Sequence, residues 1–305
     1  MTTGVDQTSC HISAPAKINL GLQVLGKRPD GFHDIHTTFV ALDLYDRLHV
    51  AKTNAGGVCL DLDATPVGER ERLDFPLDER NLIIRAVRLL ERQTNRQFDL
   101  RISVEKRIPT AAGLGGGSAD AAAALRAVDL LYDLALPVET QMALAARLGS
   151  DVPFFLNGPA AVGEGRGEQL TPISIFQNWW ALLVSPPVGL RAADIYAQLG
   201  LTSRRSPSSL DFRGDGKEFF SAVRRCHNDL ESVAIRHVPE LSRWQQSVRA
   251  AGAENVFVSG SGPTIVGIFQ QRPADGTVRG LQEQSTEVRV ILARPVTTPA
   301  ALFVE

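Results

Sequence analysis

The chain has 305 residues, of which 44% are hydrophobic and 22% charged, and its formal net charge is −2. This length suits one large domain or two ordinary ones, and the composition is that of a globular protein with a sizeable core. Because the net charge is close to zero, nucleic acid and anionic membrane surfaces are not expected partners.

The cysteines and the apolar runs indicate the cellular compartment. Cys10, Cys59 and Cys226 are odd in number and none has the spacing of a structural zinc site, so we expect reduced thiols. The first ten residues are polar and no apolar run approaches the length of a membrane span. These features predict a cytoplasmic protein.

Hydrophobic periodicity predicts the elements of the first half. Strands are expected at 18–24, 35–42, 48–51 and 98–104, with a turn at 26–31 and a helix at 81–93. A helix over 119–132 and another from Pro137 to about residue 149 follow, then a short loop at 150–153. The stretches 160–162 and 169–173 flank a glycine-rich turn and predict a hairpin.

The second half has a different texture. An apolar strand is expected at 180–185, a polar surface loop at 203–217, helices at 217–226 and 239–251, and strands at 256–258 and 264–269 around a second glycine-rich loop. Strands and helices are mixed without a steady βαβ alternation, which favours an α+β fold. We place a domain boundary near residue 160.

A glycine-rich segment, residues 106–120 (KRIPTAAGLGGGSAD), leads into an alanine-rich helix. Glycines let a ligand approach the backbone, and the first N–H groups of a helix attract anions, so this segment predicts a phosphate-binding loop. It is not a Walker A loop, because no Lys precedes Ser118. It is not a dinucleotide fingerprint either, because Ser118 stands where the third glycine belongs.

Three polar residues gain meaning from this loop. Taken alone, Lys17 is most simply a solvated lysine, while Asp151 and Ser118 are most simply helix N-caps. Phosphoryl transfer, however, needs a phosphate cradle, a cation and a carboxylate that orients or deprotonates the acceptor hydroxyl. The loop, Lys17 and Asp151 are the right types for these roles.

An aromatic residue and an imidazole, Phe32 and His33, end the turn. They could be ordinary core packing, or Phe32 could stack on a base that His33 hydrogen-bonds. His33, Asp34 and His36 lack zinc spacing, so we do not expect a metal triad.

Six motifs occur in an order that resembles a known superfamily, the GHMP kinases of galactokinase, homoserine kinase, mevalonate kinase and phosphomevalonate kinase. They are residues 15–20 (PAKINL), 26–33, 113–120, 148–153, 163–167 and 259–263. The first motif together with Asp-Gly-Phe-His at 30–33 is similar to the branch whose substrate is a diphosphocytidyl methylerythritol.

The resemblance implies a fold and an activity. The fold would comprise an N-terminal ATP-binding domain of ribosomal-protein-S5-like type (1–160) and a ferredoxin-like C-terminal domain on the substrate side (161–305). The enzyme would use ATP with Mg²⁺ to phosphorylate the 2-hydroxyl of the cytidyl substrate, a step of the non-mevalonate route to isoprenoid precursors. It would be a monomer or a weak homodimer.

The resemblance also implies residue roles. Asp151 would be the general base, assisted by Lys17, and Asn19 would position the substrate. His33 would read the cytosine edge, with Phe32 and Tyr196 packed on the ring. The residues implied at the ATP site are Asn81, Pro109, Ala111, Ala112, Gly113, Leu114, Gly115, Gly116, Gly117 and Ser118. No side chain is implied as a magnesium ligand.

The sequence departs from the family pattern at three places. Phe32 stands where the family often has Tyr, Ala119 replaces a second Ser, and the segment before Tyr196 lacks an expected Thr. Two alternatives remain. The first is another superfamily kinase, such as homoserine or mevalonate kinase. The motif at 30–33 argues against it, because neither of their substrates carries a base to stack. A nucleotide-binding regulator would not need both Lys17 and Asp151.

Overall fold

The computed structural model describes residues 8–63, 75–200, 206–207, 211–296 and 303–304. Within these residues, two sheets organise the chain. The first is seven-stranded, with the order β11-β1-β2-β4-β3 and a hairpin, β5–β6, attached to β2. The second is four-stranded, with the order β10-β7-β9-β8. The mixed arrangement confirms the α+β class.

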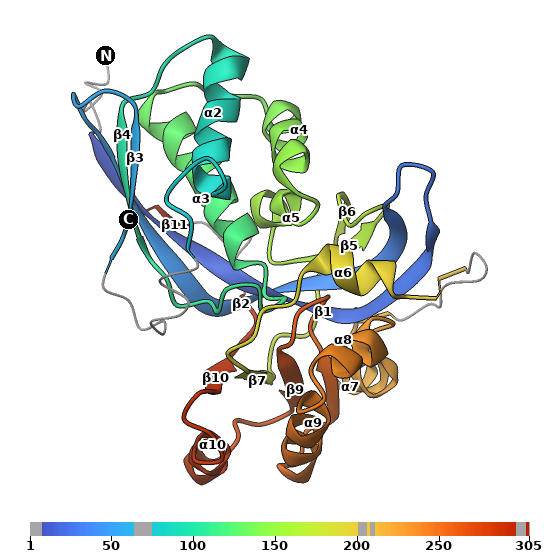
Figure 1. Cartoon of the computed structure of the whole chain (residues 1–305). Coiled ribbons are helices and arrows are strands. Elements are labelled where there is room, and N and C mark those ends of the chain that lie inside the picture. The colour runs from blue at the N-terminus through green and yellow to red at the C-terminus, as the bar shows by residue number, and fades with distance from the viewer. Residues whose placement is uncertain (1–7, 64–74, 201–205, 208–210, 297–302, 305) are drawn as a thin grey trace.

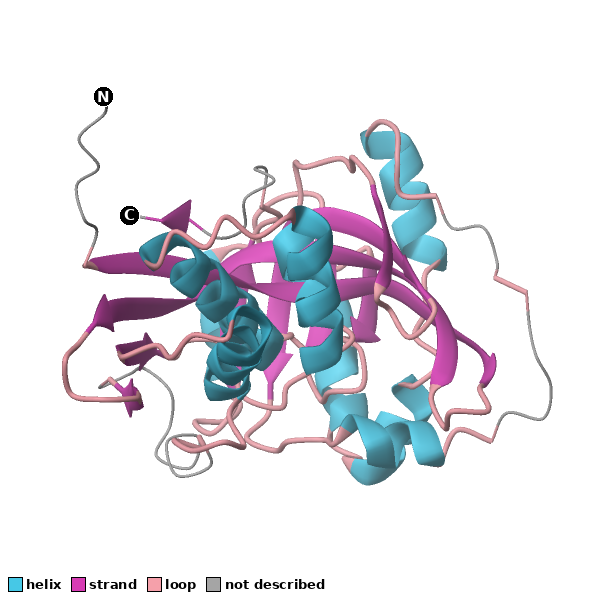
Figure 2. Ribbon diagram, turned by 90° about the horizontal axis from the view of Figure 1, so that it is seen from above, coloured by secondary structure: helices cyan, strands magenta, loops and turns pink. Residues whose placement is uncertain are grey.

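Two long strands, β1 (Ser9–Lys27) and β2 (His33–Lys52), form the backbone of the first sheet. They run side by side across the width of the molecule, as Figure 1 and Figure 2 show. Shorter strands complete the sheet: β3 (Val58–Leu62), β4 (Leu100–Glu105), β5 (Ala160–Glu164), β6 (Gln169–Pro172) and β11 (Phe303–Val304). β3 and β4 pair in parallel, and the other neighbours are antiparallel.

One face of this sheet is covered by helices (Figure 1). They are α2 (Leu82–Thr94), α3 (Gly116–Leu131), α4 (Val138–Leu148) and α5 (Val152–Asn157). The alanines of α3 are almost wholly buried, and their small side chains let α3 pack closely against α2 and β1. This packing fixes the start of α3 close to β1.

The second sheet is built from β7 (Trp180–Ser185), β8 (Asn255–Val258), β9 (Ile265–Phe269) and β10 (Arg289–Ala293). The helices of this half of the chain are α6 (Ala192–Ala197), α7 (Gly216–Arg225), α8 (Glu231–His237), α9 (Leu241–Ala250) and α10 (Asp275–Gln282). Of these, α6 packs through Ile195 against β1 and β2 of the first sheet. Across the sheet, the strands that come fourth, first, third and second in the chain are neighbours, and all pairs are antiparallel. Helices α6 to α9 connect the first strand to the second, and α10 connects the third to the fourth. This ferredoxin-like arrangement is the expected one.

The two halves share a hydrophobic core. Ile18 and Leu20 of β1 pack with Trp179, Phe219 and other residues of the second half. Because side chains alternate along a strand, the neighbouring residues of β1 point to the opposite side. Leu42 of β2 also forms an isolated bridge with Pro295, which follows β10. No helix in the described part of the chain is long and apolar enough to cross a bilayer.

The elements differ from the expectations at several places. The strands expected at 35–42 and 48–51 are one strand, and the loop expected at 150–153 leads at Val152 into the short helix α5. Residues 203–205 and 208–210 of the polar loop expected at 203–217 lie outside the described residues, and the end of that stretch is the start of α7 at Gly216. The first sheet continues through β6, past residue 160, so the division into two domains there stays a prediction.

Candidate active site

An ion pair joins two residues that are far apart in the sequence. Lys17 Nζ lies 3.2 Å from Asp151 Oδ2, and their side chains are 4% and 33% exposed. Lys17 comes from β1, and Asp151 is the residue before α5. The Asp151 side chain makes no capping hydrogen bond, so its carboxylate is not used to stabilise α5. The simple reading of Lys17 as a solvated lysine is therefore wrong, while Asp151 does occupy the N-cap position of α5 but leaves its carboxylate free of the helix.

The ammonium of Lys17 is held in place by its neighbours. Nζ donates to Asn19 Oδ1 at 2.7 Å, and Asn19 Nδ2 donates to Thr37 Oγ1 at 2.9 Å. Nζ also lies 5.3 Å from the centroid of the Phe39 ring. The backbone N–H of Lys17 donates to Leu114 O at 2.8 Å, which ties β1 to the glycine-rich loop. These contacts hold the side chains of Lys17 and Asn19 in fixed positions on β1.

The glycine-rich loop closely approaches Lys17. A Cβ at Gly115 would lie 2.8 Å from Lys17 Cγ and 2.9 Å from Phe155 Cζ. Gly115 has φ +73° and is the N-cap of α3, with no side chain available to cap its N–H groups. The first N–H groups of α3 are therefore available to an anion. Ser118 lies within α3, so the N-cap reading of Ser118 is wrong.

A second glycine-rich loop, residues 259–263, supports the first. Ser259 Oγ donates to Gly113 O at 3.0 Å. A Cβ at Gly262 would lie 2.1 Å from Gly113 N, so the two backbones touch at a position where only glycine fits. The loop from the second half of the chain thus fixes the loop of the first half.

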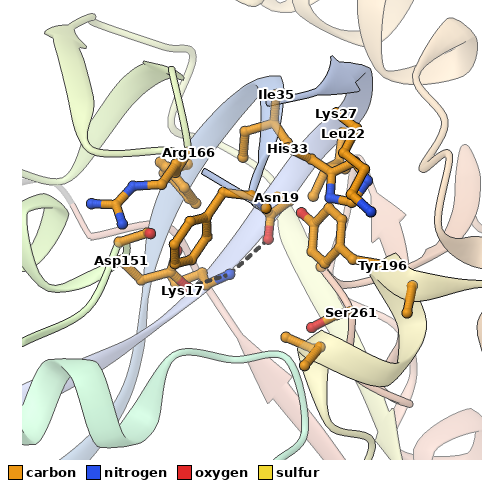
Figure 3. Close-up of a pocket in the computed structure, with 18 residues that line it drawn as sticks. Lys17, Asn19, Leu22, Lys27, His33, Ile35, Asp151, Arg166, Tyr196 and Ser261 are labelled. Atoms are coloured by element: carbon orange, nitrogen blue, oxygen red, sulfur yellow. Dashed lines mark hydrogen bonds and ion pairs between the residues drawn. The ribbon is translucent and has the colours of Figure 1, made fainter. Parts of the chain in front are cut away.

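A cavity of about 490 Å³ opens in front of the ion pair (Figure 3). Lys17, Asn19, Phe32, His33, Asp151 and Tyr196, the residues expected at the substrate and catalytic sites, all line it. Lys27, Arg166 and Ser261 also line it and were not singled out as site residues. Arg166 belongs to the motif at 163–167, which was the available signal.

The rings of Phe32, His33 and Tyr196 line the same cavity as the ion pair. The rings of His33 and Tyr196 stack with centroids 5.2 Å apart. The Phe32 ring is half exposed and has the Arg166 guanidinium 4.6 Å from its centroid. Burial, with a contribution from the charge of Lys27, lowers the pKa of His33 below its usual value. Burial, with a contribution from Asp151, raises the pKa of Tyr196, so the phenol keeps its proton.

A second cavity of about 310 Å³ lies on the other side of the glycine-rich loop. The expected ATP residues that line it are Asn81, Pro109, Ala111, Ala112, Gly113, Gly115, Gly116 and Gly117. Leu114 and Ser118 do not line it, and the Leu114 side chain is buried in the core. Asn81 also caps α2, because its Oδ1 accepts a hydrogen bond from Ile83 N at 2.9 Å.

A buried charge cluster borders this second cavity, and the sequence did not indicate it. Lys106 Nζ contacts Asp46 and lies 2.7 Å from Asp120 Oδ2. Asp46 Oδ1 accepts hydrogen bonds from the backbone N–H groups of Arg107 and Ile108, so the cluster anchors the entry to the loop. Burial raises the pKa of Asp120 to about 7, and its Oδ1 has no hydrogen-bond partner among the described residues.

Known proteins match most of the chain. Residues 81–159 match the family "GHMP kinases N terminal domain" and residues 209–285 match "GHMP kinases C terminal". The chain is 38% identical to the 4-diphosphocytidyl-2-C-methyl-D-erythritol kinase of Bacillus subtilis, covering 91% of this chain and 96% of that protein. It is 37% identical to the enzyme of the same name from Shouchella clausii, over 92% and 94% of the two chains.

Solved structures agree with these relatives. A crystal structure of 4-(cytidine 5'-diphospho)-2C-methyl-D-erythritol kinase matches with a TM-score of 0.70 and 32% identity, over 94% of this chain and 99% of that one. A homoserine kinase from Cytophaga hutchinsonii matches with a TM-score of 0.72 over both full chains, but at 17% identity it shows the fold alone. The chain therefore belongs to the 4-diphosphocytidyl-2-C-methyl-D-erythritol kinase family of the GHMP kinases.

Proposed function

We propose that this kinase transfers the γ-phosphoryl group of ATP to the 2-hydroxyl of 4-diphosphocytidyl-2-C-methyl-D-erythritol. The products are the 2-phosphate and ADP, a step of the non-mevalonate route to isoprenoid precursors. The observation that carries the proposal is the Lys17–Asp151 pair, which lines one cavity and packs against the glycine-rich loop that lines the other. An alcohol in the first cavity and phosphates in the second would meet there.

The reaction needs an acceptor for the hydroxyl proton. Asp151 Oδ is the proposed acceptor, because a carboxylate within hydrogen-bond reach makes an alcohol a better nucleophile as phosphoryl transfer proceeds. Lys17, 3.2 Å away, pairs with this carboxylate and places positive charge where negative charge develops. Asn19 orients the Lys17 ammonium through their 2.7 Å hydrogen bond and would help to position the substrate.

The substrate would lie along the first cavity. His33 is proposed to hydrogen-bond the cytosine edge, with Phe32 and Tyr196 against the ring. Because the pKa of His33 is lowered, its imidazole is neutral near pH 7 and offers one donor and one acceptor. Phe32 lacks the hydroxyl that the family often has, so its contribution would be packing alone.

ATP would bind in the second cavity, with its phosphates on the N–H groups at the start of α3 and on the backbone of residues 109–117. Among the described residues, no group of three or more His, Cys, Asp or Glu side chains could hold a metal ion by itself. The unpartnered, buried Asp120 Oδ1 in this cavity does fit a Mg²⁺ ion that arrives on the nucleotide. Such an ion would neutralise charge on the β- and γ-phosphates.

We also infer a cytoplasmic protein that acts on this small molecule as a monomer or weak homodimer. The activity is tested by measuring ADP release with the cytidyl substrate, mevalonate and homoserine in parallel. We expect turnover with the cytidyl substrate only. Equal or faster turnover with mevalonate or homoserine would overturn the proposal, since neither has a base for Phe32, His33 and Tyr196 to contact.

A further inference from the structure

A third cavity lies between α2 and α4, away from the two described above. Its volume is about 290 Å³. It is lined by Glu79, Arg85, Arg88, Leu89, Arg92, Arg147 and Leu148, none of which lines the other two cavities. Arg85, Arg88 and Arg92 come from α2, and Arg147 comes from the last turn of α4, which stands beside α2 in Figure 1.

The arginines of this cavity are only partly neutralised. Arg88 pairs with Glu79 at 3.0 Å and with Glu91 at 2.8 Å. No carboxylate among the described residues pairs with Arg85, Arg92 or Arg147, so the cavity holds an excess of positive charge. This excess is local, because the chain as a whole carries a net charge of −2.

Helix stability explains only part of this arrangement. Arg92 and Arg147 lie in the last turns of their helices, where the helix dipole favours a cation. Arg85 lies in the first turn of α2, where the dipole disfavours a cation. An anion in the cavity would compensate for this placement.

We propose that this cavity binds a small anion that carries two or more phosphate groups. Guanidinium groups match phosphate oxygens in a bidentate fashion. Arg85 and Arg92 are two helical turns apart, about 10.5 Å along α2, so a chain of phosphates matches their spacing better than one phosphate does. The cavity is compact and the chain is acidic overall, which favours a small anion over a nucleic acid.

The test is calorimetric titration of inorganic tripolyphosphate into the full-length protein. The nucleotide cavity can also take tripolyphosphate, so the number of sites is compared between variants. Arg85→Gln/Arg147→Gln should bind one equivalent fewer than the wild type, or bind at the third cavity at least tenfold more weakly. Arg92→Gln alone should weaken the same site, with a fall in melting temperature of only about 1–3 °C from the lost charge at the end of α2.

The matched control is Arg236→Gln/Arg249→Gln, which removes two exposed arginines of α8 and α9 and should leave the titration unchanged. Identical isotherms for the wild type and Arg85→Gln/Arg147→Gln would overturn the site. Equal affinity for orthophosphate and tripolyphosphate would overturn the need for two phosphates. Binding of duplex DNA through these arginines, with no tripolyphosphate site, would overturn the choice of a small anion. None of these outcomes depends on the kinase activity.

Discussion

The Lys17 ammonium has three N–H donors but only two acceptors among the described residues. Nζ carries three donors, and the described acceptors are Asn19 Oδ1 and Asp151 Oδ2. The remaining donor is available to a phosphoryl oxygen. We propose that this one ammonium both pairs with the Asp151 carboxylate and contacts the transferred phosphate, and its burial against Phe39 and Gly115 would hold it in place for both.

Removal of the Asp151 charge should reduce chemistry and spare binding of ATP. Asp151→Asn keeps the shape of the side chain, and α5 loses nothing because the carboxylate does not cap it. We expect kcat to fall by about 10²–10⁴, the usual contribution of a general base. The Kd of an ATP analogue, measured by calorimetry, should be unchanged. Near-normal turnover in this variant would remove Asp151 from the mechanism.

The lowered pKa of His33 makes a prediction about pH. Burial, followed by the charge of Lys27, keeps the imidazole neutral to a lower pH than the ordinary value of 6.5. Protonation removes the ring acceptor, so the KM for the cytidyl substrate should be flat above that value and rise as the pH falls below it.

The matched variant for this prediction is His33→Asn, which retains a donor and an acceptor but does not titrate. Its KM should be higher than that of the wild type and should lose the additional rise at low pH. A wild-type profile that runs parallel to the His33→Asn profile would show that His33 does not read the base.

Residues were predictable where a motif surrounds them. Lys17, Asp151 and His33 lie in recognisable segments, and the structure brings them to one cavity. The buried Lys106 cluster was not predictable, because Asp46, Lys106 and Asp120 are separated in the sequence and each resembles a surface residue. Only the burial of all three shows that the charges compensate one another.

At the scale of elements, the long periodic segments were predicted well. The strand at 180–185 and the β5–β6 hairpin agree with the structure almost to the residue. The short helices α5, α6 and α8 were missed, because six or seven residues contain too few turns to establish a period. β1 and β2 were underestimated in length because bulges, such as that between Pro15 and Ala16, interrupt the alternation.

The start of α3 yields a prediction about glycine. Gly115→Ala imposes φ +73° on an alanine and places a Cβ 2.8 Å from Lys17 Cγ, so Lys17 and the loop must separate. We expect kcat/KM for ATP to fall at least tenfold and the free energy of unfolding to fall by about 1–3 kcal/mol. Coupled-assay kinetics and urea unfolding measure the two effects.

The control for this change is Gly56→Ala, at a glycine with φ +76° and no atom within 4 Å of the added Cβ. This variant strains the backbone in the same way but places no atom against Lys17. Its free energy of unfolding should therefore fall by about 1 kcal/mol, and its activity should not change. If both variants behaved alike, the contact between Gly115 and Lys17 would have no role in the site.

At the scale of the whole molecule, the active-site loop depends on both halves of the chain. Ser259, whose side chain donates to Gly113 O, lies 146 positions after that glycine in the chain. The motifs in the sequence indicated two glycine-rich loops, but not that their backbones touch. That contact depends on how the second sheet docks under β1 and β2, and hydrophobic periodicity contains no information on docking.

This contact makes the final prediction. In Gly262→Ala the added Cβ would lie 2.1 Å from Ala112 C and Gly113 N, backbone atoms that cannot move aside singly. The two halves must shift apart, and we expect a loss of about 1–3 kcal/mol in unfolding free energy together with a fall in kcat.

Gly280→Ala is the matched control in the same half. It lies in α10 with no atom within 4 Å of its Cβ, and alanine there should add about 0.5–1 kcal/mol through helix propensity. Relative to the wild type, the urea midpoint should therefore fall in Gly262→Ala and rise in Gly280→Ala. A Gly262→Ala midpoint equal to that of the wild type would mean that the halves meet loosely and that the loop holds its shape without support.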